Sequence, residues 1–150
     1  MLSTLPKKGM MDSMPKGTCL KFVRAKDINL IPRYLFEQVK PMDFDIDALY
    51  KWAPIIYDNP MNILGAFLDS ENKVKGVMIC SFNPVNQTII VPLLSVDKEY
   101  YGKGILKEAD GILNKFKRTL GAKKISIVTT RPHAMEKIGY AKSSVTMMEK

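Results

Sequence analysis

The feature that most constrains the fold is a long apolar segment that leads into a glycine-containing loop. Residues 87–96, QTIIVPLLSV, have the composition of a strand that is buried on both faces. Pro92 lies within this segment. Since proline donates no backbone hydrogen bond, the strand must either lie at a sheet edge or carry a bulge there. The segment is too apolar for an edge strand, so we expect a bulge near Pro92.

The loop and the helical pattern after this strand have the chemistry of an anion-binding site. Gly102 and Gly104 flank Lys103 in the sequence EYYGKG. From residue 105 to 120 apolar side chains recur at helical spacing, and Gly121 follows as a C-terminal cap. N–H groups at a helix N-terminus are unpaired and the helix dipole adds positive potential, so the loop is suited to bind a pyrophosphate. The alternative is a strand-to-helix turn that binds nothing, because two glycines at this spacing are common.

The rest of the chain predicts a mixed α/β domain. Residues 1–18 lack any period and are expected to form a flexible N-terminal arm, followed by a single domain over 19–150. Two helices are expected after the first strand, with Asn29 as the N-cap of the first and Trp52 on the apolar side of the second. A short helix is expected in HAMEKIGY. The predicted strands are CLKFVRA, ILGAFLD, VKGVMICSF, QTIIVPLLSV, a buried KISIVTT and a final SSVTMME.

Composition excludes several classes of function. The chain has 150 residues and is 46% hydrophobic, which suits one globular domain. Two cysteines form no disulfide framework, and a single histidine, His133, excludes zinc sites built on several histidines, so no metal ion is expected. We expect His133 to be an exposed residue at a helix start. No apolar run approaches the roughly 20 residues needed to cross a bilayer and no signal-peptide pattern is present, so a cytoplasmic location is expected.

Charge is distributed unevenly along the chain. The formal net charge is +8, and residues 101–150 carry most of it. Nucleic acid, a phosphorylated cofactor and a solvated face without a partner are the three interpretations of this surface. Because no recognised nucleic-acid-reading motif is present, nucleic acid is not expected as a partner. The acidic cluster of Asp43, Asp45 and Asp47 is more typical of a helix N-terminus than of a docking site for a cationic substrate.

The order of the elements resembles the GNAT superfamily of acyl-CoA-dependent N-acetyltransferases over about residues 20–150. In that family a bulged central strand leads into a [Q/R]-x-x-G-x-[G/A] loop that binds the coenzyme A pyrophosphate, and here the window is EYYGKG, Glu99 to Gly104. Members also often carry a Y-E-K-x-G-[FY]-like element near the end, here MEKIGY, Met135 to Tyr140. The resemblance implies an α/β (α+β) fold with a mixed, mostly antiparallel central sheet and helices on both faces.

The same resemblance implies acetyl-CoA as the cofactor and assigns it to two neighbouring segments. The end of the strand would pair with the pantetheine arm, and the loop would bind the pyrophosphate. The bulge would splay this strand from KISIVTT and open a slot for the acyl group. The implied cofactor-binding residues are Leu94, Ser95, Val96, Tyr100, Tyr101, Gly102, Lys103, Gly104 and Ile105.

Two positions depart from the family pattern. Glu99 stands where the family prefers Gln or Arg, and a carboxylate repels a pyrophosphate. Met135 replaces a tyrosine that protonates the departing thiolate in many members, and methionine has no such proton. Asp97, Glu99 or a water relay could act as base, and Tyr100 or Tyr101 as acid. The sequence selects none of them, so no catalytic residue is assigned.

Two functions follow from the resemblance. The first is an acetyl-CoA-dependent N-acetyltransferase, whose partners would be a coenzyme A thioester and an amine acceptor. The second is a non-catalytic GNAT-like protein of a tailed bacteriophage, because small proteins of this kind occur among head-assembly and virion proteins. Its partners would then be phage proteins, and its location the host cytoplasm or the virion. No interaction with a membrane is expected from either function.

Overall fold

The fold is built on one mixed sheet. The computed structural model describes residues 20–39, 45–129, 131–144 and 148–150, so the predicted arm at 1–18 lies outside the described residues. In the described part, five strands follow one another in the order β1-β2-β3-β4-β5, and all neighbours are antiparallel except β4 and β5, which are parallel. The strands are β1 Lys21–Arg24, β2 Asn62–Leu68, β3 Val74–Asn83, β4 Thr88–Val96 and β5 Lys124–Ile127.

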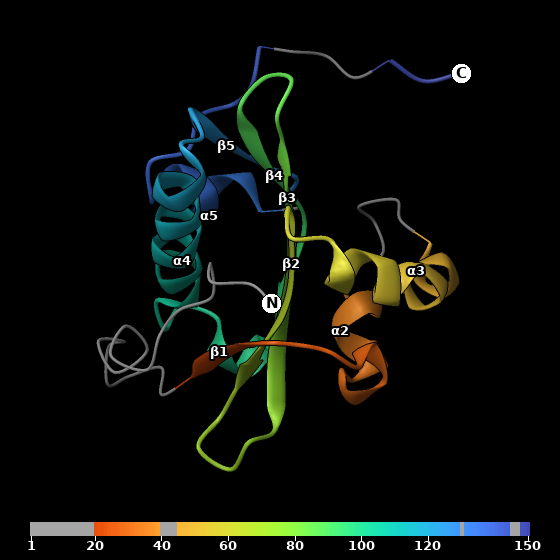
Figure 1. Cartoon of the computed structure of the whole chain (residues 1–150). Helices are drawn as coiled ribbons and strands as arrows, with labels where there is room; N and C mark the ends of the chain where they lie inside the picture. Colours follow the sequence, from red (N-terminus) through yellow and green to blue (C-terminus); the bar gives the residue numbers. More distant parts are fainter. Residues whose placement is uncertain (1–19, 40–44, 130, 145–147) are drawn as a thin grey trace.

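Helices cover both faces of this sheet (Figure 1). The long helix α4, Ile105–Leu120, lies on one face, with the short helix α5, Pro132–Glu136, beside it. The other face carries the 3-10 helix η1, Ile28–Leu30, and the helices α2, Arg33–Glu37, and α3, Ile46–Asp58. This arrangement confirms the predicted fold class. None of the helices in the described segments is long and apolar enough to cross a membrane.

Two apolar clusters hold the helices to the sheet. On the α4 face, Phe116 is fully buried against Phe22 and Phe67 of the sheet cluster. On the other face, Leu35 and Phe36 of α2 are fully buried. Each fully buried side chain of this size contributes about 1.5–3 kcal/mol of hydrophobic free energy, which fixes the position of α4 against the strands. The buried positions of α4 are those that the helical spacing predicts: Ile105, Ala109, Ile112, Leu113 and Phe116.

Strand β4 carries the predicted bulge. Its pairing with β3 shifts between Ile79 and Ser81, where β4 contains one residue more than β3. Pro92 lies in this irregular stretch and is exposed. Val91 packs in the cluster on the α4 face, whereas Leu93 packs on the opposite face. A regular strand would place two such residues on the same face, so the bulge reverses the orientation of the rest of the strand.

The prediction of one continuous helix after the first strand, capped by Asn29, is wrong. The structure has two short helices there, η1 and α2. Asp27 rather than Asn29 supplies the cap, since its Oδ1 accepts a hydrogen bond from the Asn29 N–H at 2.9 Å. Ile31 is extended, with φ −89° and ψ 121°. Proline disfavours the helical conformation in the residue before it, so Pro32 separates η1 from α2, which begins at Arg33.

Two further predictions are corrected, and a third lies partly outside the described residues. Trp52 is 50% exposed, whereas its neighbour Ala53 is 4% exposed and lies in the apolar cluster on the face of α2. Strand β5 alternates between exposed and half-buried residues instead of being buried, since it is the last strand of the described sheet. Of the predicted final strand, residues 145–147 lie outside the described residues, and the described residues on either side are not in a strand.

Candidate functional site

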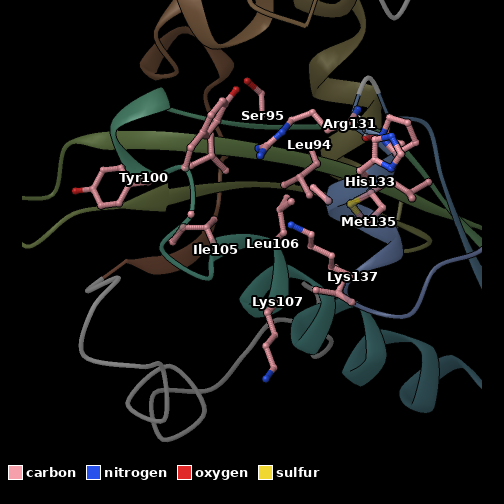
Figure 2. A pocket seen from close by; sticks show the side chains of 18 of the residues that line it. Leu94, Ser95, Tyr100, Ile105, Leu106, Lys107, Arg131, His133, Met135 and Lys137 are labelled. Carbon is pink, nitrogen blue, oxygen red and sulfur yellow. Dashed lines mark hydrogen bonds between the residues drawn. The ribbon is translucent and has the colours of Figure 1, made fainter.

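A cleft opens where β4 and β5 separate. Backbone pairing of the two strands ends at Val91 and Ile127, and the N–H of Val128 donates to the carbonyl of Val91 at 3.1 Å. The bulge at this point turns the rest of β4 away from β5. The cleft has a volume of about 670 Å³ and is lined by the ends of both strands, the glycine loop, the N-terminal end of α4, and α5 with the residues that follow it (Figure 2).

The end of β4 presents backbone polar groups to this cleft. The N–H of Asp97 donates to the carbonyl of Lys75 on β3 at 2.7 Å. Because successive residues of a strand point their polar groups in opposite directions, those of Leu94 and Val96 point away from β3 and toward the cleft. The side chain of Gln38 already donates to the Val96 carbonyl at 2.7 Å. This edge therefore suits an extended ligand that carries amide groups.

The side chain of Ser95 is bound to α2 and to Gln38. Its hydroxyl donates to the carbonyl of Leu35 at 2.5 Å and accepts a hydrogen bond from Gln38 Nε2 at 2.7 Å. The residue is 2% exposed. Ser95 therefore fixes the end of β4 to α2, and its hydroxyl is already engaged.

The glycine loop leaves its backbone accessible. The 3-10 helix η3, Lys98–Tyr100, precedes it and is capped by Asp97, whose Oδ1 accepts from the Glu99 N–H at 3.1 Å. Gly102 and Gly104 are in the left-handed region, with φ of 77° and 82°, and no described atom lies within 4 Å of a Cβ built at either. Helix α4 then begins without a side-chain cap. An anion can thus approach the unpaired N–H groups of the helix N-terminus.

The fold brings nearly all predicted cofactor-binding residues to this one cleft. Lys103 is the exception, since it is not among the lining residues and its ammonium lies 5.5 Å from the centroid of the Tyr100 ring. The predicted residues that line the cleft are Leu94, Ser95, Val96, Tyr100, Tyr101, Gly102, Gly104 and Ile105.

Glu99, which departs from the family pattern, faces away from the cleft. Its Oε1 lies 3.2 Å from Nζ of Lys75 on β3, and this hydrogen bond raises the pKa of the Lys75 ammonium. Glu99 is not among the residues that line the cleft. The repulsion expected from its charge is therefore offset by a cation from a strand distant in sequence.

The fold around this cleft is shared with solved acetyltransferase structures. No protein-family model matches the sequence, and no curated protein shows a significant sequence match. The structure of AAC(6′)-Iy in complex with the bisubstrate analogue CoA-S-monomethyl-acetylneamine matches with a TM-score of 0.69 and 12% identity, covering 87% of this chain and 95% of that chain. Glucosamine-6-phosphate N-acetyltransferase from Arabidopsis thaliana matches with a TM-score of 0.67 and 14% identity over 87% and 97%. The chain has the GNAT fold.

A third match within the GNAT fold is also an acetyltransferase. The aminoglycoside 6′-N-acetyltransferase AAC(6′)-Ih from Acinetobacter baumannii has a TM-score of 0.68 and 12% identity, covering 87% of this chain and 97% of that chain. At these identities the three matches show the fold of the chain. They give no support to the bacteriophage alternative.

The opposite wall of the cleft carries cations that the sequence did not single out. The Arg131 guanidinium carbon lies 4.2 Å from the centroid of the Tyr101 ring, so this side chain reaches from the end of β5 to the loop after β4. Figure 2 shows Lys137 extending toward Leu106 in the cleft, whereas Lys107 points away from it. The sequence alone does not show that β4 and β5 are parallel neighbours. Because parallel strands bring together the residues that follow their C-terminal ends, this pairing would have placed Arg131 near the glycine loop.

The MEKIGY element forms part of this wall. Met135 is 4% exposed and lines the cleft. The prediction for His133 is confirmed: it lies in the first turn of α5, its side chain is 95% exposed, and its Nδ1 is 3.3 Å from Oε1 of Glu136. The Tyr140 hydroxyl donates to Oδ1 of Asp110 on α4 at 2.7 Å. Burial, and then this bond, raise the pKa of Tyr140. The hydrogen bond attaches this wall of the cleft to α4.

Asp97 connects the end of β4 to α2 and makes this connection sensitive to acid. The Tyr34 hydroxyl donates to Oδ2 of Asp97 at 2.5 Å, which lowers the pKa of that carboxyl below its usual 3.8. Because the folded state binds this proton less tightly than the unfolded state, the carboxylate stabilises the fold above the unfolded pKa. That stabilisation is lost as the pH falls through the lower, folded pKa.

Asp97→Asn keeps an oxygen for the cap but removes the charge that accepts the Tyr34 hydrogen bond, so it is expected to lower the free energy of unfolding at neutral pH by about 1 kcal/mol, the difference between a charge-assisted and a neutral hydrogen bond. The difference from the wild type should narrow below about pH 4, where the wild-type carboxyl also becomes protonated. Urea unfolding of both proteins across the acid range measures this difference. A difference that does not change with pH would contradict the assigned role.

Proposed function

We propose that this protein is an acyl-CoA-dependent N-acetyltransferase that acts on an amine. The observation that carries the proposal is the cleft itself. There the bulged strand β4 separates from β5, and the opening lies next to the glycine loop and the uncapped N-terminus of α4. Phosphate groups bind well to such N–H groups, and the helix dipole adds to the attraction. AAC(6′)-Iy, which has the same fold, holds a coenzyme A bisubstrate analogue in its solved structure.

The residues of the cleft fit the parts of coenzyme A. The N–H groups around Gly102 and Gly104 are accessible to the pyrophosphate. The backbone groups of Leu94 and Val96 face the cleft, where the amides of the pantetheine arm would pair with them. Charge is also suitable, because the charged side chains among the described lining residues are all basic, and Arg131 and Lys137 extend along the cleft (Figure 2).

The reaction needs a well-placed thioester more than a strong acid. The acceptor nitrogen attacks the thioester carbonyl carbon, a C–N bond forms, the C–S bond breaks, and the amine proton passes to solvent. The N–H of Leu94 faces the cleft and is placed to stabilise the negative charge that develops on the carbonyl oxygen. Since a thiol is a far stronger acid than water, as the cysteine pKa of about 8.5 illustrates, a thiolate can leave without prior protonation, and the methionine at position 135 does not prevent turnover.

Thermal unfolding with and without acetyl-CoA tests the binding half of this proposal. At 100 times its dissociation constant, acetyl-CoA should stabilise the native state by about 2.7 kcal/mol. A second assay measures release of the free thiol when an aminoglycoside, an amino-sugar phosphate or a polyamine is added. Failure of millimolar acetyl-CoA to stabilise the protein would contradict the proposal. Stabilisation without thiol release from any amine would instead favour the non-catalytic alternative.

A further inference from the structure

We propose that Lys75 is a positioning residue that keeps the Glu99 carboxylate away from the glycine loop, so that the pyrophosphate of coenzyme A can bind there. This inference rests on the proposed function. Lys75 lies on β3, whereas Glu99 lies in η3, shortly before the loop. The two side chains meet only in the folded chain. Their pairing neutralises the negative charge of Glu99, which would otherwise repel the pyrophosphate.

Lys75 contacts the segment after β4 through both its side chain and its backbone. Its Nζ lies 3.2 Å from Oε1 of Glu99, and the two side chains are 23% and 55% exposed. Its carbonyl accepts a hydrogen bond from the Asp97 N–H at 2.7 Å, and Asp97 is bound in turn by the Tyr34 hydroxyl. Both partners of the ion pair are therefore attached to the end of β4, and the more buried of the two is the lysine.

Without Lys75, the Glu99 carboxylate would become an internal competitor for the loop. A carboxylate and a phosphate are bound by the same unpaired N–H groups and the same helix dipole. Glu99 is only a few residues from Gly102, so its effective concentration at the loop would be high. Because no side chain caps α4, that position is open to it.

Repulsion adds to this competition. A free carboxylate beside the loop would raise the energy of a bound pyrophosphate through like-charge interaction, and salt would screen this effect. Lys75 removes both problems, since it neutralises the carboxylate and orients it toward β3.

Four proteins test the inference through the dissociation constant of acetyl-CoA, measured by titration calorimetry at low salt. Lys75→Met, which keeps the aliphatic stem, should raise that constant by about tenfold, an order-of-magnitude estimate for one misplaced charge. The double variant Lys75→Met/Glu99→Gln should return it to the wild-type value. Lys73→Met is the matched control: Lys73 directly precedes β3, its Nζ lies 4.0 Å from Oε2 of Glu71, and its loss should leave binding unchanged.

Rescue separates a positioning role from a merely structural one. If Lys75 only supported the fold, the double variant would bind as weakly as the single variant, and that result would overturn the inference. A Lys75→Met variant with wild-type affinity would also overturn it. The loss caused by Lys75→Met should shrink in high salt, and a loss that does not depend on salt counts against the charge argument. If the wild type binds no acetyl-CoA, the proposed function itself fails, and this inference falls with it.

Discussion

Replacing Gly102 by glutamate is expected to weaken acetyl-CoA binding by about 100-fold or more, because like charges in contact cost several kcal/mol and each 1.4 kcal/mol is tenfold in affinity. The new carboxylate would lie in the loop where the pyrophosphate is proposed to bind. No described atom lies within 4 Å of the position its Cβ would take, so the side chain enters open space at the cleft instead of breaking the core.

Gly121→Glu provides the matched control for this change. Gly121 has a φ of 68°, close to the 77° of Gly102, and is equally open around its Cβ position. Both variants therefore bear a similar backbone strain. Gly121 follows the C-terminal end of α4, whereas Gly102 precedes the helix. Calorimetric titration should find wild-type affinity in Gly121→Glu only, and equal affinities in the two variants would place the ligand away from the loop.

Gly65→Ala is expected to have the largest effect on stability, a loss of about 1–3 kcal/mol as is typical of overpacking. A Cβ at this position would lie 2.1 Å from Cζ of Phe22. The Phe22 ring is fully buried and packs on Phe67 with ring centroids 4.9 Å apart, so it has little space to move. The free energy of unfolding in urea measures the loss.

The same substitution at Gly111 should have the opposite sign. Gly111 is exposed within α4, and no described atom outside the neighbouring turns of the helix lies within 4 Å of a Cβ built there. Alanine should therefore stabilise the helix by about 0.5–1 kcal/mol. A glycine inside a helix often marks close approach to another element, but the structure shows no such neighbour here. A gain of stability in Gly65→Ala would contradict the packing described around Phe22, and a loss in Gly111→Ala would contradict the open position described at Gly111.

The elements that the sequence predicted well are those with local causes. The apolar period of residues 105–120 fixed the buried face of α4, and a proline in an apolar strand required the bulge that the register of β4 shows. The glycine loop was recognisable for the same reason, because Gly102 and Gly104 take positive φ values that other residues rarely adopt.

The features that the sequence could not predict depend on residues that only the fold brings together. Nothing near Glu99 in the sequence indicates that Lys75 neutralises it. In the same way, Arg131 reaches Tyr101 only because β4 and β5 are parallel neighbours. Trp52 shows a different limit: apolar spacing identifies a helix face only approximately, and the buried face of α3 contains Ala53 instead of Trp52.

Amide hydrogen exchange, resolved by residue and measured with and without acetyl-CoA, tests most directly whether the cleft between β4 and β5 is the binding site. Bound ligand should slow exchange at the loop amides Gly102 to Ile105 and at the amides of Leu94 and Val96, which point into the cleft. Unchanged exchange at both segments under conditions where acetyl-CoA is bound would contradict this assignment.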